Sequence, residues 1–185
     1  MSQAYAIRLS GAGGQGIILA GMILAEAAGL YEGHFVVQSQ SYGPELRGGD
    51  SISEVIISDQ PIAYPRALRL DLLVALTEES AQANISDLVE GGLLLIDPDL
   101  VIIPPRTEYI PIPCTRLAFK TTKTQIAANM VALGALTSLC PLINAGAMRK
   151  AIRNRLPAES VEANLKAFKA GQKEGEPFVR TSAEE

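Results

Sequence analysis

The sequence predicts an α/β fold, a single domain built on an open, mostly parallel, doubly wound (Rossmann-like) sheet with helices on both faces. Short apolar segments alternate along the chain with stretches of helical periodicity, which is the pattern of strand–helix–strand units. Two of these segments, at 71–77 and 93–97, are runs of apolar residues, as expected for parallel strands covered on both faces. The chain of 185 residues is long enough for one such domain.

The first part of the chain predicts a strand, a glycine turn and a helix. Residues 4–10 are an apolar run that ends in glycines, and 13–30 carries isoleucine, leucine and methionine at helical spacing. A second strand is expected at 34–40. It is followed by a glycine-rich loop at 41–50 and by a third strand at 51–58, where apolar and polar residues alternate.

The middle of the chain predicts a capped helix between the two apolar strands. Thr77 follows the first of them and is a good N-cap, and Glu78 and Glu79 lie in the first turn, where the helix dipole favours carboxylates. We expect Gly91-Gly92 to end this helix just before the strand at 93–97.

The last part predicts a short strand at 109–112 and then helices. The expected helices span 116–139, 145–155 and 158–171, and the C-terminal helices within 145–171 are followed by a flexible tail at 176–185. Residues 125–139 carry no charge at all. Such a helix is buried all round, either in its own core or under a partner chain.

Charge is scarce in this sequence. The chain has 36 charged residues, 19% of the total, against about 25% in an average soluble domain. This shortage indicates surface that is covered by another chain. The net charge of −4 is the opposite of what a nucleic-acid-binding protein needs.

The residue types that usually carry catalysis or metals are nearly absent. The two cysteines, Cys114 and Cys140, form no CxxC motif, which favours buried free thiols over an iron–sulfur or zinc site. His34 is the only histidine, which argues against a Ser-His-Asp set. We therefore expect no catalytic residue and no metal ligand here. The absence of a signal peptide and of a membrane span predicts a cytoplasmic protein.

The segment Gly11-Ala12-Gly13-Gly14-Gln15-Gly16 fits the GxGxxG pattern between a strand and a helix. Its glycines permit a tight turn, a close approach of backbone to a phosphate, and close helix packing. A dinucleotide enzyme also needs a carboxylate about 20 residues on, and the second strand ends without one. NAD and NADP are therefore disfavoured, and a turn that serves packing alone is the alternative.

The loop at 41–50 is the second candidate site. It reads Ser41-Tyr42-Gly43-Pro44-Glu45-Leu46-Arg47-Gly48-Gly49-Asp50 and follows the carboxyl end of the second strand, where open α/β sheets place their binding crevice. A loop of this length and composition is typical of a functional segment. The alternative is a surface loop with a local Glu45–Arg47 pair.

Four motifs together resemble a known family. They are GAGGQG at 11–16, QSQSYGPELRGGDS at 38–51, VIISD at 55–59 and NMVALGAL at 129–136. In these segments and in length, the chain is similar to the gamma subunit of 2-oxoacid:ferredoxin oxidoreductases, of the 2-oxoglutarate or 2-ketoisovalerate type.

The resemblance implies a non-catalytic subunit of a complex that oxidatively decarboxylates a 2-oxoacid, here 2-oxoglutarate, to an acyl-CoA and reduces ferredoxin. It implies thiamine diphosphate, magnesium and iron–sulfur clusters on partner chains, namely alpha and beta subunits and a ferredoxin-like delta chain or ferredoxin. It places this chain on the CoA side, with Arg47 facing an anionic group, either a CoA phosphate or a carboxylate on a partner chain, and with Tyr42 stacking or hydrogen-bonding there. The residues expected to line that crevice are Gly11, Gly13, Gly14, Gln15, Gly16, Ser41, Tyr42, Gly43, Arg47, Gly48 and Gly49.

Two other functions stay open. One is an independent Rossmann-type nucleotide-binding oxidoreductase, and the other is a purely structural scaffold subunit whose glycine loops contact only other chains. If the chain is a gamma subunit, the isolated chain is expected to be inactive and to form a homo-oligomer.

Overall fold

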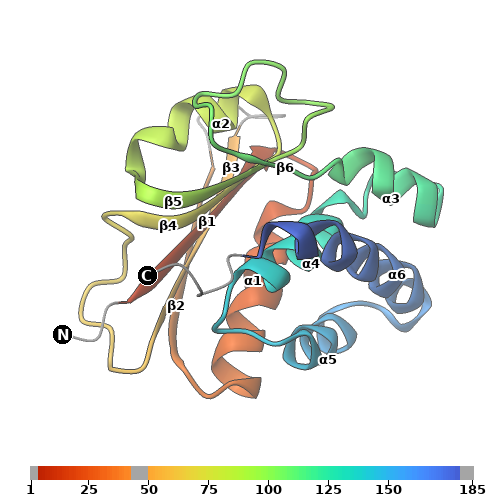
Figure 1. Ribbon diagram of the computed structural model, residues 1–185. Helices are drawn as coiled ribbons and strands as arrows, with labels where there is room; N and C mark the ends of the chain where they lie inside the picture. The colour runs from red at the N-terminus through yellow and green to blue at the C-terminus, as the bar shows by residue number, and fades with distance from the viewer. Residues whose placement is uncertain (1–3, 43–49, 180–185) are drawn as a thin grey trace.

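The computed structural model describes residues 4–42 and 50–179. Over these residues the chain forms one six-stranded sheet with helices on both faces (Figure 1). The strands are β1 (Tyr5–Ala12), β2 (Phe35–Tyr42), β3 (Asp50–Ser58), β4 (Leu70–Ala75), β5 (Leu88–Ile96) and β6 (Ile110–Pro111), in the order β2-β3-β1-β4-β5-β6. The predicted α/β class is confirmed.

The sheet is mostly parallel, as predicted. Strands β1, β4, β5 and β6 pair in parallel, whereas β3 is antiparallel to both β1 and β2. Among the described strands, β3 alone therefore runs against the others. The physical reason is the connection before it: residues 43–49 are too few for the crossover that a parallel neighbour requires.

The helices divide unequally between the faces of the sheet. Helix α2 (Glu78–Asn84) contacts β1 and β4 on one face, and α1 (Ile17–Glu26) packs on β1, β2 and β3 on the other. Each face has its own cluster of buried apolar side chains. The helices α3 (Cys114–Thr122), α4 (Ala128–Leu139), α5 (Ala145–Arg155) and α6 (Ala158–Gly175) join the α1 side, and short turns lie at η1 (Ala27–Tyr31), η2 (Ile85–Asp87) and η3 (Glu176–Phe178).

The uncharged helix belongs to the protein's own core. Every residue of α4 from Ala128 to Thr137 is buried, and α6 lies directly against it. Glycines allow this contact: a Cβ added to Gly134 or Gly171 would lie under 3.0 Å from backbone atoms of the facing helix. The lack of charge in this segment therefore follows from internal packing and requires no partner.

Several predicted boundaries differ from the structure. The helix expected over 13–30 begins at Ile17, the last helix runs to Gly175 rather than to 171, and residues 176–178, expected in the tail, form η3.

A predicted helix end was also wrong. The glycines Gly91 and Gly92 do not end a helix, because α2 ends at Asn84 and both glycines lie inside β5. There they form an irregularity, since Leu70 pairs with Leu88 but Leu72 pairs with Leu93, and Gly91 has a φ of 74°. A glycine in a strand is a signal for such a bulge as much as for a helix end.

The expected single helix over 116–139 is two helices. The first, α3, ends at Thr122, and the following Lys123 has a φ of 63°. The Thr122 hydroxyl donates to the Ala118 and Thr124 carbonyls at 2.8 and 3.0 Å. Hydroxyl side chains that bond to nearby backbone in this way compete with helix continuation.

A buried charged cluster ties β1 to its neighbours on the α2 side. Arg8 is only 8% exposed and donates to Glu54 of β3 at 2.9 Å and to Asn84 of α2 at 2.9 Å. It also pairs with Asp87 at 2.5 Å. Asn84 in turn donates to Ser10 at 3.0 Å. The cluster fixes α2 against the centre of the sheet.

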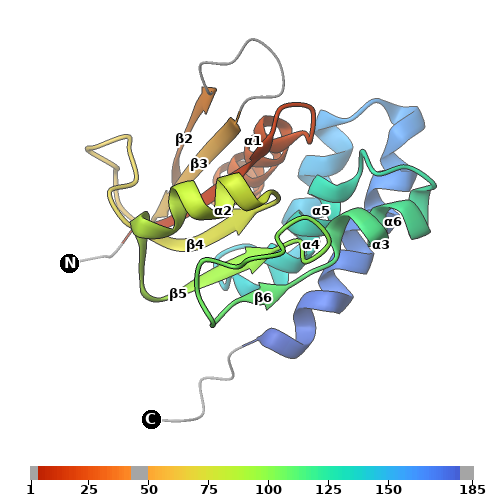
Figure 2. The ribbon, with the colours of Figure 1, turned by 90° about the horizontal axis from the view of Figure 1, so that it is seen from above.

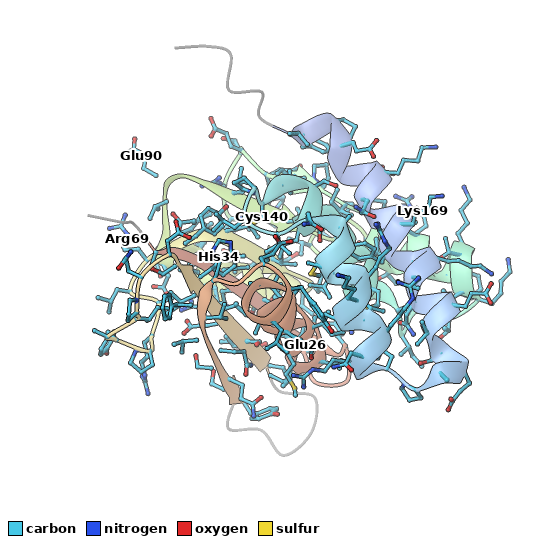
Figure 3. The ribbon with its side chains drawn as sticks, turned by 90° about the horizontal axis from the view of Figure 1, so that it is seen from below. Glu26, His34, Arg69, Glu90, Cys140 and Lys169 are labelled. Atoms are coloured by element: carbon cyan, nitrogen blue, oxygen red, sulfur yellow. The ribbon has the colours of Figure 1, made fainter. Side chains whose placement is uncertain are left out.

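Polar contacts also fix α1 and its following turn (Figure 3). Glu26, at the end of α1, is buried and accepts from Arg155 of α5 at 2.5 Å and from Asn154 at 2.7 Å. The ring of His34 lies 2.9 Å from Asp59 and 3.2 Å from the Leu142 carbonyl. Glu26 thus joins the end of α1 to α5, and His34 joins the residue before β2 to Asp59 and Leu142.

The two cysteines, Cys114 and Cys140, are free and buried, as predicted. Burial raises the pKa of the Cys140 thiol to about 11 and raises that of Cys114 well above its ordinary value. Neither thiol is poised as a nucleophile, since nucleophilic cysteines have lowered pKa values. No helix of the described residues is long and apolar enough to cross a membrane.

Candidate functional site

The first glycine segment and the described ends of the second, Ser41-Tyr42 and Asp50, lie at one edge of the sheet. Strands β1 and β2 both end there, and β3 begins between them, with Ala12 opposite Asp50 and Tyr42 opposite Ser51. Figure 2 shows the end of β2, the start of β3 and the turn after β1 side by side, with α1 behind them. This is the carboxyl edge of the parallel strands, where open α/β sheets bind ligands.

The turn after β1 is held closed by Gln15. Its backbone N–H donates to the Ala12 carbonyl at 3.2 Å, and its side-chain oxygen accepts from the Ala12 N–H at 2.7 Å. Gly14 and Gly16 have φ values of 93° and 73°, which side chains disfavour. Gln15 therefore shapes the turn rather than pointing its amide oxygen at a ligand.

Helix α4 reaches this turn through Asn129. The Asn129 side chain donates to the Gly16 carbonyl at 3.1 Å and is 4% exposed. A Cβ on Gly16 would collide with that amide group. The buried amide of Asn129 thus has its hydrogen-bond partner in the glycine turn itself.

The contact brings two helix N-termini together. Neither α1, which begins after Gly16, nor α4, which begins after Ala127, has a side-chain cap on its first turn. Gly13 and Gly14 are exposed beside them, and their N–H groups make no hydrogen bond within the described part of the chain. Uncapped N–H groups and the positive ends of two helix dipoles attract an anion.

The second glycine segment is only partly described. Ser41 and Tyr42 are exposed at the end of β2, with Tyr42 65% exposed. Gly43, Arg47, Gly48 and Gly49 lie outside the described residues. Asp50 was not singled out from the sequence, although it stands opposite Ala12 at the mouth of the glycine turn. Its position depends on β3 being antiparallel, which the sequence analysis did not anticipate.

The carboxylates of Asp97 and Glu78, at this same edge, accept hydrogen bonds from backbone N–H groups. Asp97 is fully buried at the end of β5, and its two oxygens accept from the N–H groups of Asp99 at 3.1 Å and Thr115 at 2.8 Å. Thr77 and Ser80 form a reciprocal cap on α2, so the predicted cap is confirmed. Glu78 accepts from the N–H groups of Ile102 and Ile103 at 3.0 and 3.1 Å. No cluster of histidine, cysteine or carboxylate side chains within the described residues can hold a metal ion.

Fold and site together define a protein class. Residues 6–174 match the pyruvate ferredoxin/flavodoxin oxidoreductase family, and the chain belongs to that family. The resemblance to gamma subunits of 2-oxoacid:ferredoxin oxidoreductases, predicted from the sequence motifs, is confirmed.

Within the family, the chain is similar to subunits of 2-oxoglutarate synthase. It is 48% identical over 169 residues to subunit KorC of Methanocaldococcus jannaschii. The aligned residues cover 89% of this chain and 90% of that protein. The identity to KorC of Methanothermobacter marburgensis is 44% over 174 residues, with 90% of this chain and 94% of that protein covered.

Two solved structures of oxoacid:ferredoxin oxidoreductases are also similar to this chain. The keto/oxoacid ferredoxin oxidoreductase gamma subunit of Geobacter sulfurreducens superposes with a TM-score of 0.85 and is 47% identical, covering 94% of this chain and 97% of that one. The 2-oxoglutarate:ferredoxin oxidoreductase of Magnetococcus marinus, solved with 2-oxoglutarate, coenzyme A and succinyl-CoA, gives a TM-score of 0.86 at 25% identity. This match covers 99% of our chain and 33% of that longer one.

Proposed function

We propose that the chain is the gamma subunit of a complex that converts 2-oxoglutarate and CoA to succinyl-CoA with reduction of ferredoxin. The observation that carries this is the identity of 44–48% to KorC subunits over nearly the whole chain. The chain would act only together with partner subunits. Alpha and beta subunits would carry thiamine diphosphate and magnesium, and iron–sulfur clusters would lie on partner chains, including a ferredoxin-like delta chain or ferredoxin.

The role of this chain in the complex is to form one wall of the CoA site. The supporting feature is the carboxyl edge, where Gly13 and Gly14 offer free backbone N–H groups beside two uncapped helix N-termini. A CoA phosphate suits these donors. Tyr42 is exposed at the end of β2, two strands away at the same edge, and would stack on the adenine or bond to a polar group. Arg47 would meet an anion, as the family resemblance implies.

The dinucleotide alternative is weaker in this fold. In a Rossmann enzyme the strand beside β1 ends in the carboxylate that binds the ribose. Here β1 lies between β3, which runs the other way, and β4, and the next strand along the chain, β2, lies one strand further out than β3. A purely structural role for the two segments is the remaining alternative, and the following experiment separates it from CoA binding.

Gly13→Asp in the assembled complex is expected to raise the KM for CoA about tenfold or more and to leave the KM for 2-oxoglutarate unchanged. A carboxylate placed among these N–H groups repels a phosphate within a few ångströms, and about 1.4 kcal/mol of repulsion is a factor of ten. Steady-state kinetics with each substrate varied in turn measures the effect.

Gly13→Asn is the matched control because it has the same size without the charge. A much smaller rise in the KM for CoA is expected for it. Equal KM values for the aspartate variant and the unmodified complex would show that no anion binds at this edge. Failure of both variants to assemble would favour the structural role.

A further inference from the structure

The two edge strands of the sheet, β6 and β2, differ in how well they are protected against pairing with another strand. The edge formed by β6 is short, has only the residues Ile110 and Pro111, and therefore includes one residue without an N–H. Next to it, Arg106 donates to the carbonyls of Glu108 and Gly92. Short length, proline and an arginine across the edge are the devices by which proteins keep a sheet edge from pairing with another chain.

The opposite edge, formed by β2, has none of these devices. Its eight residues read FVVQSQSY, with no charge and no proline. All eight pair with β3 without a register shift, from Phe35 opposite Ser58 to Tyr42 opposite Ser51. Because β2 is the last strand of the sheet among the described residues, every second N–H and carbonyl faces outward. The Ser39 carbonyl accepts side-chain hydrogen bonds from Gln38 at 3.2 Å and from Ser53 of β3 at 3.5 Å.

Such an edge is a template for another strand. A long, regular, uncharged edge strand invites pairing with a second chain, and natural proteins leave it open only where it is covered in the working state. The side chains at its two ends fit this reading, since Phe35 is 50% and Tyr42 65% exposed. The exposed aromatic groups would be covered together with the backbone.

We propose that the outer edge of β2 pairs with a strand of a partner subunit of the oxidoreductase, which extends the sheet across the subunit interface. This inference rests on the proposed function, which supplies the partner. The strand it fits is an uncharged extended segment, apolar opposite Phe35 and Val37 and polar opposite Gln38 and Gln40. A partner subunit is favoured over a second copy because β2 ends at Tyr42, at the carboxyl edge that the proposed function makes one wall of a CoA site shared with the partner subunits.

Hydrogen exchange resolved to single amides tests the proposal directly. In the isolated chain, every second amide of 35–42 is expected to exchange rapidly, since it faces solvent. In the assembled complex, the same amides are expected to slow about 100-fold or more, because exchange then requires the interface to open. Docking through side chains alone would cover the strand without this alternating gain in protection.

Each other outcome is decisive. If the complex forms and the outward amides stay fast, the pairing is wrong although the proposed function stands. If these amides are already slow in the isolated chain and become fast on dilution, a second copy occupies the edge and the choice of partner is wrong. If partner subunits do not bind the chain at all, the proposed function itself fails.

Proline substitutions provide the second test. Ser39 and Gln40 are consecutive, so one points its N–H outward and the other points it at β3. The proline variant at the outward position should keep the fold of the isolated chain, as judged by circular dichroism, and weaken partner binding at least tenfold. The matched variants Ser39→Ala and Gln40→Ala keep the N–H and should bind normally. Normal binding by the folded outward proline variant would overturn the pairing.

Discussion

Replacing Gly171 by alanine is expected to destabilise the protein by about 3 kcal/mol, which lowers the melting temperature by roughly 6–12 °C for a chain of this size. A Cβ at Gly171 would lie under 3.0 Å from the carbonyl oxygen, the carbonyl carbon and the Cα of Val131. These are backbone atoms, so helices α4 and α6 would have to move apart. In an ordinary helix interior the same change would stabilise by about 1 kcal/mol, and the sign is therefore diagnostic.

Gly29→Ala is the control. The nearest atom to its added Cβ is a methyl carbon of Val36 at 3.6 Å, an ordinary contact, so a stabilisation of about 0.4–1 kcal/mol is expected. Thermal unfolding followed by circular dichroism compares the two variants. A Gly171→Ala protein as stable as the Gly29→Ala protein would mean that α4 and α6 do not cross at this point.

Arg8→Ala is expected to cost about 3–5 kcal/mol, because it leaves the carboxylate of Glu54 in the sheet interior without its counter-ion. The Arg8 and Glu54 side chains are 10% and 14% exposed, and the contact that Glu54 keeps among the described residues is the long one from Ser39 at 3.3 Å. Asn84 also loses a donor to its side-chain oxygen. Urea unfolding monitored by circular dichroism gives the change in the free energy of unfolding.

Asp87→Asn is the matched comparison in the same cluster. The Asp87 side chain is 43% exposed, so solvent screens its interaction with Arg8, and a loss of about 1 kcal/mol or less is expected. Equal losses for the two variants would contradict the view that the buried Arg8–Glu54 pair organises this side of the sheet.

The strand–helix alternation and the apolar strands were sufficient to predict the fold class, because each depends on local periodicity. The antiparallel direction of β3 was not predicted, although the short connection at 43–49 was a signal for it. The position of β3 between β1 and β2 depends on pairing between segments far apart in the sequence. The glycines Gly91 and Gly92 were misassigned for a related reason. Glycine marks a bulge and a helix end alike, and only pairing with β4 decides between them.

The candidate site was predicted in part. The spacing of GxGxxG located the turn after β1, and the position of 41–50 after a strand placed both segments at one edge. The role of Gln15 as a turn closure was not visible, because its partner is the backbone of Ala12. Asp50 and Asn129 both lie near the glycine turn after β1. Their positions depend on contacts between segments far apart in the sequence, which no local pattern encodes.

The most direct test of this account is ferredoxin reduction that depends on both 2-oxoglutarate and CoA. It should be measured for the isolated chain, for the partner subunits without it, and for the reconstituted complex. Full turnover is expected only in the reconstituted complex, and none from the isolated chain. Reduction of ferredoxin by the isolated chain with 2-oxoglutarate and CoA would contradict the assignment of this protein as a non-catalytic gamma subunit.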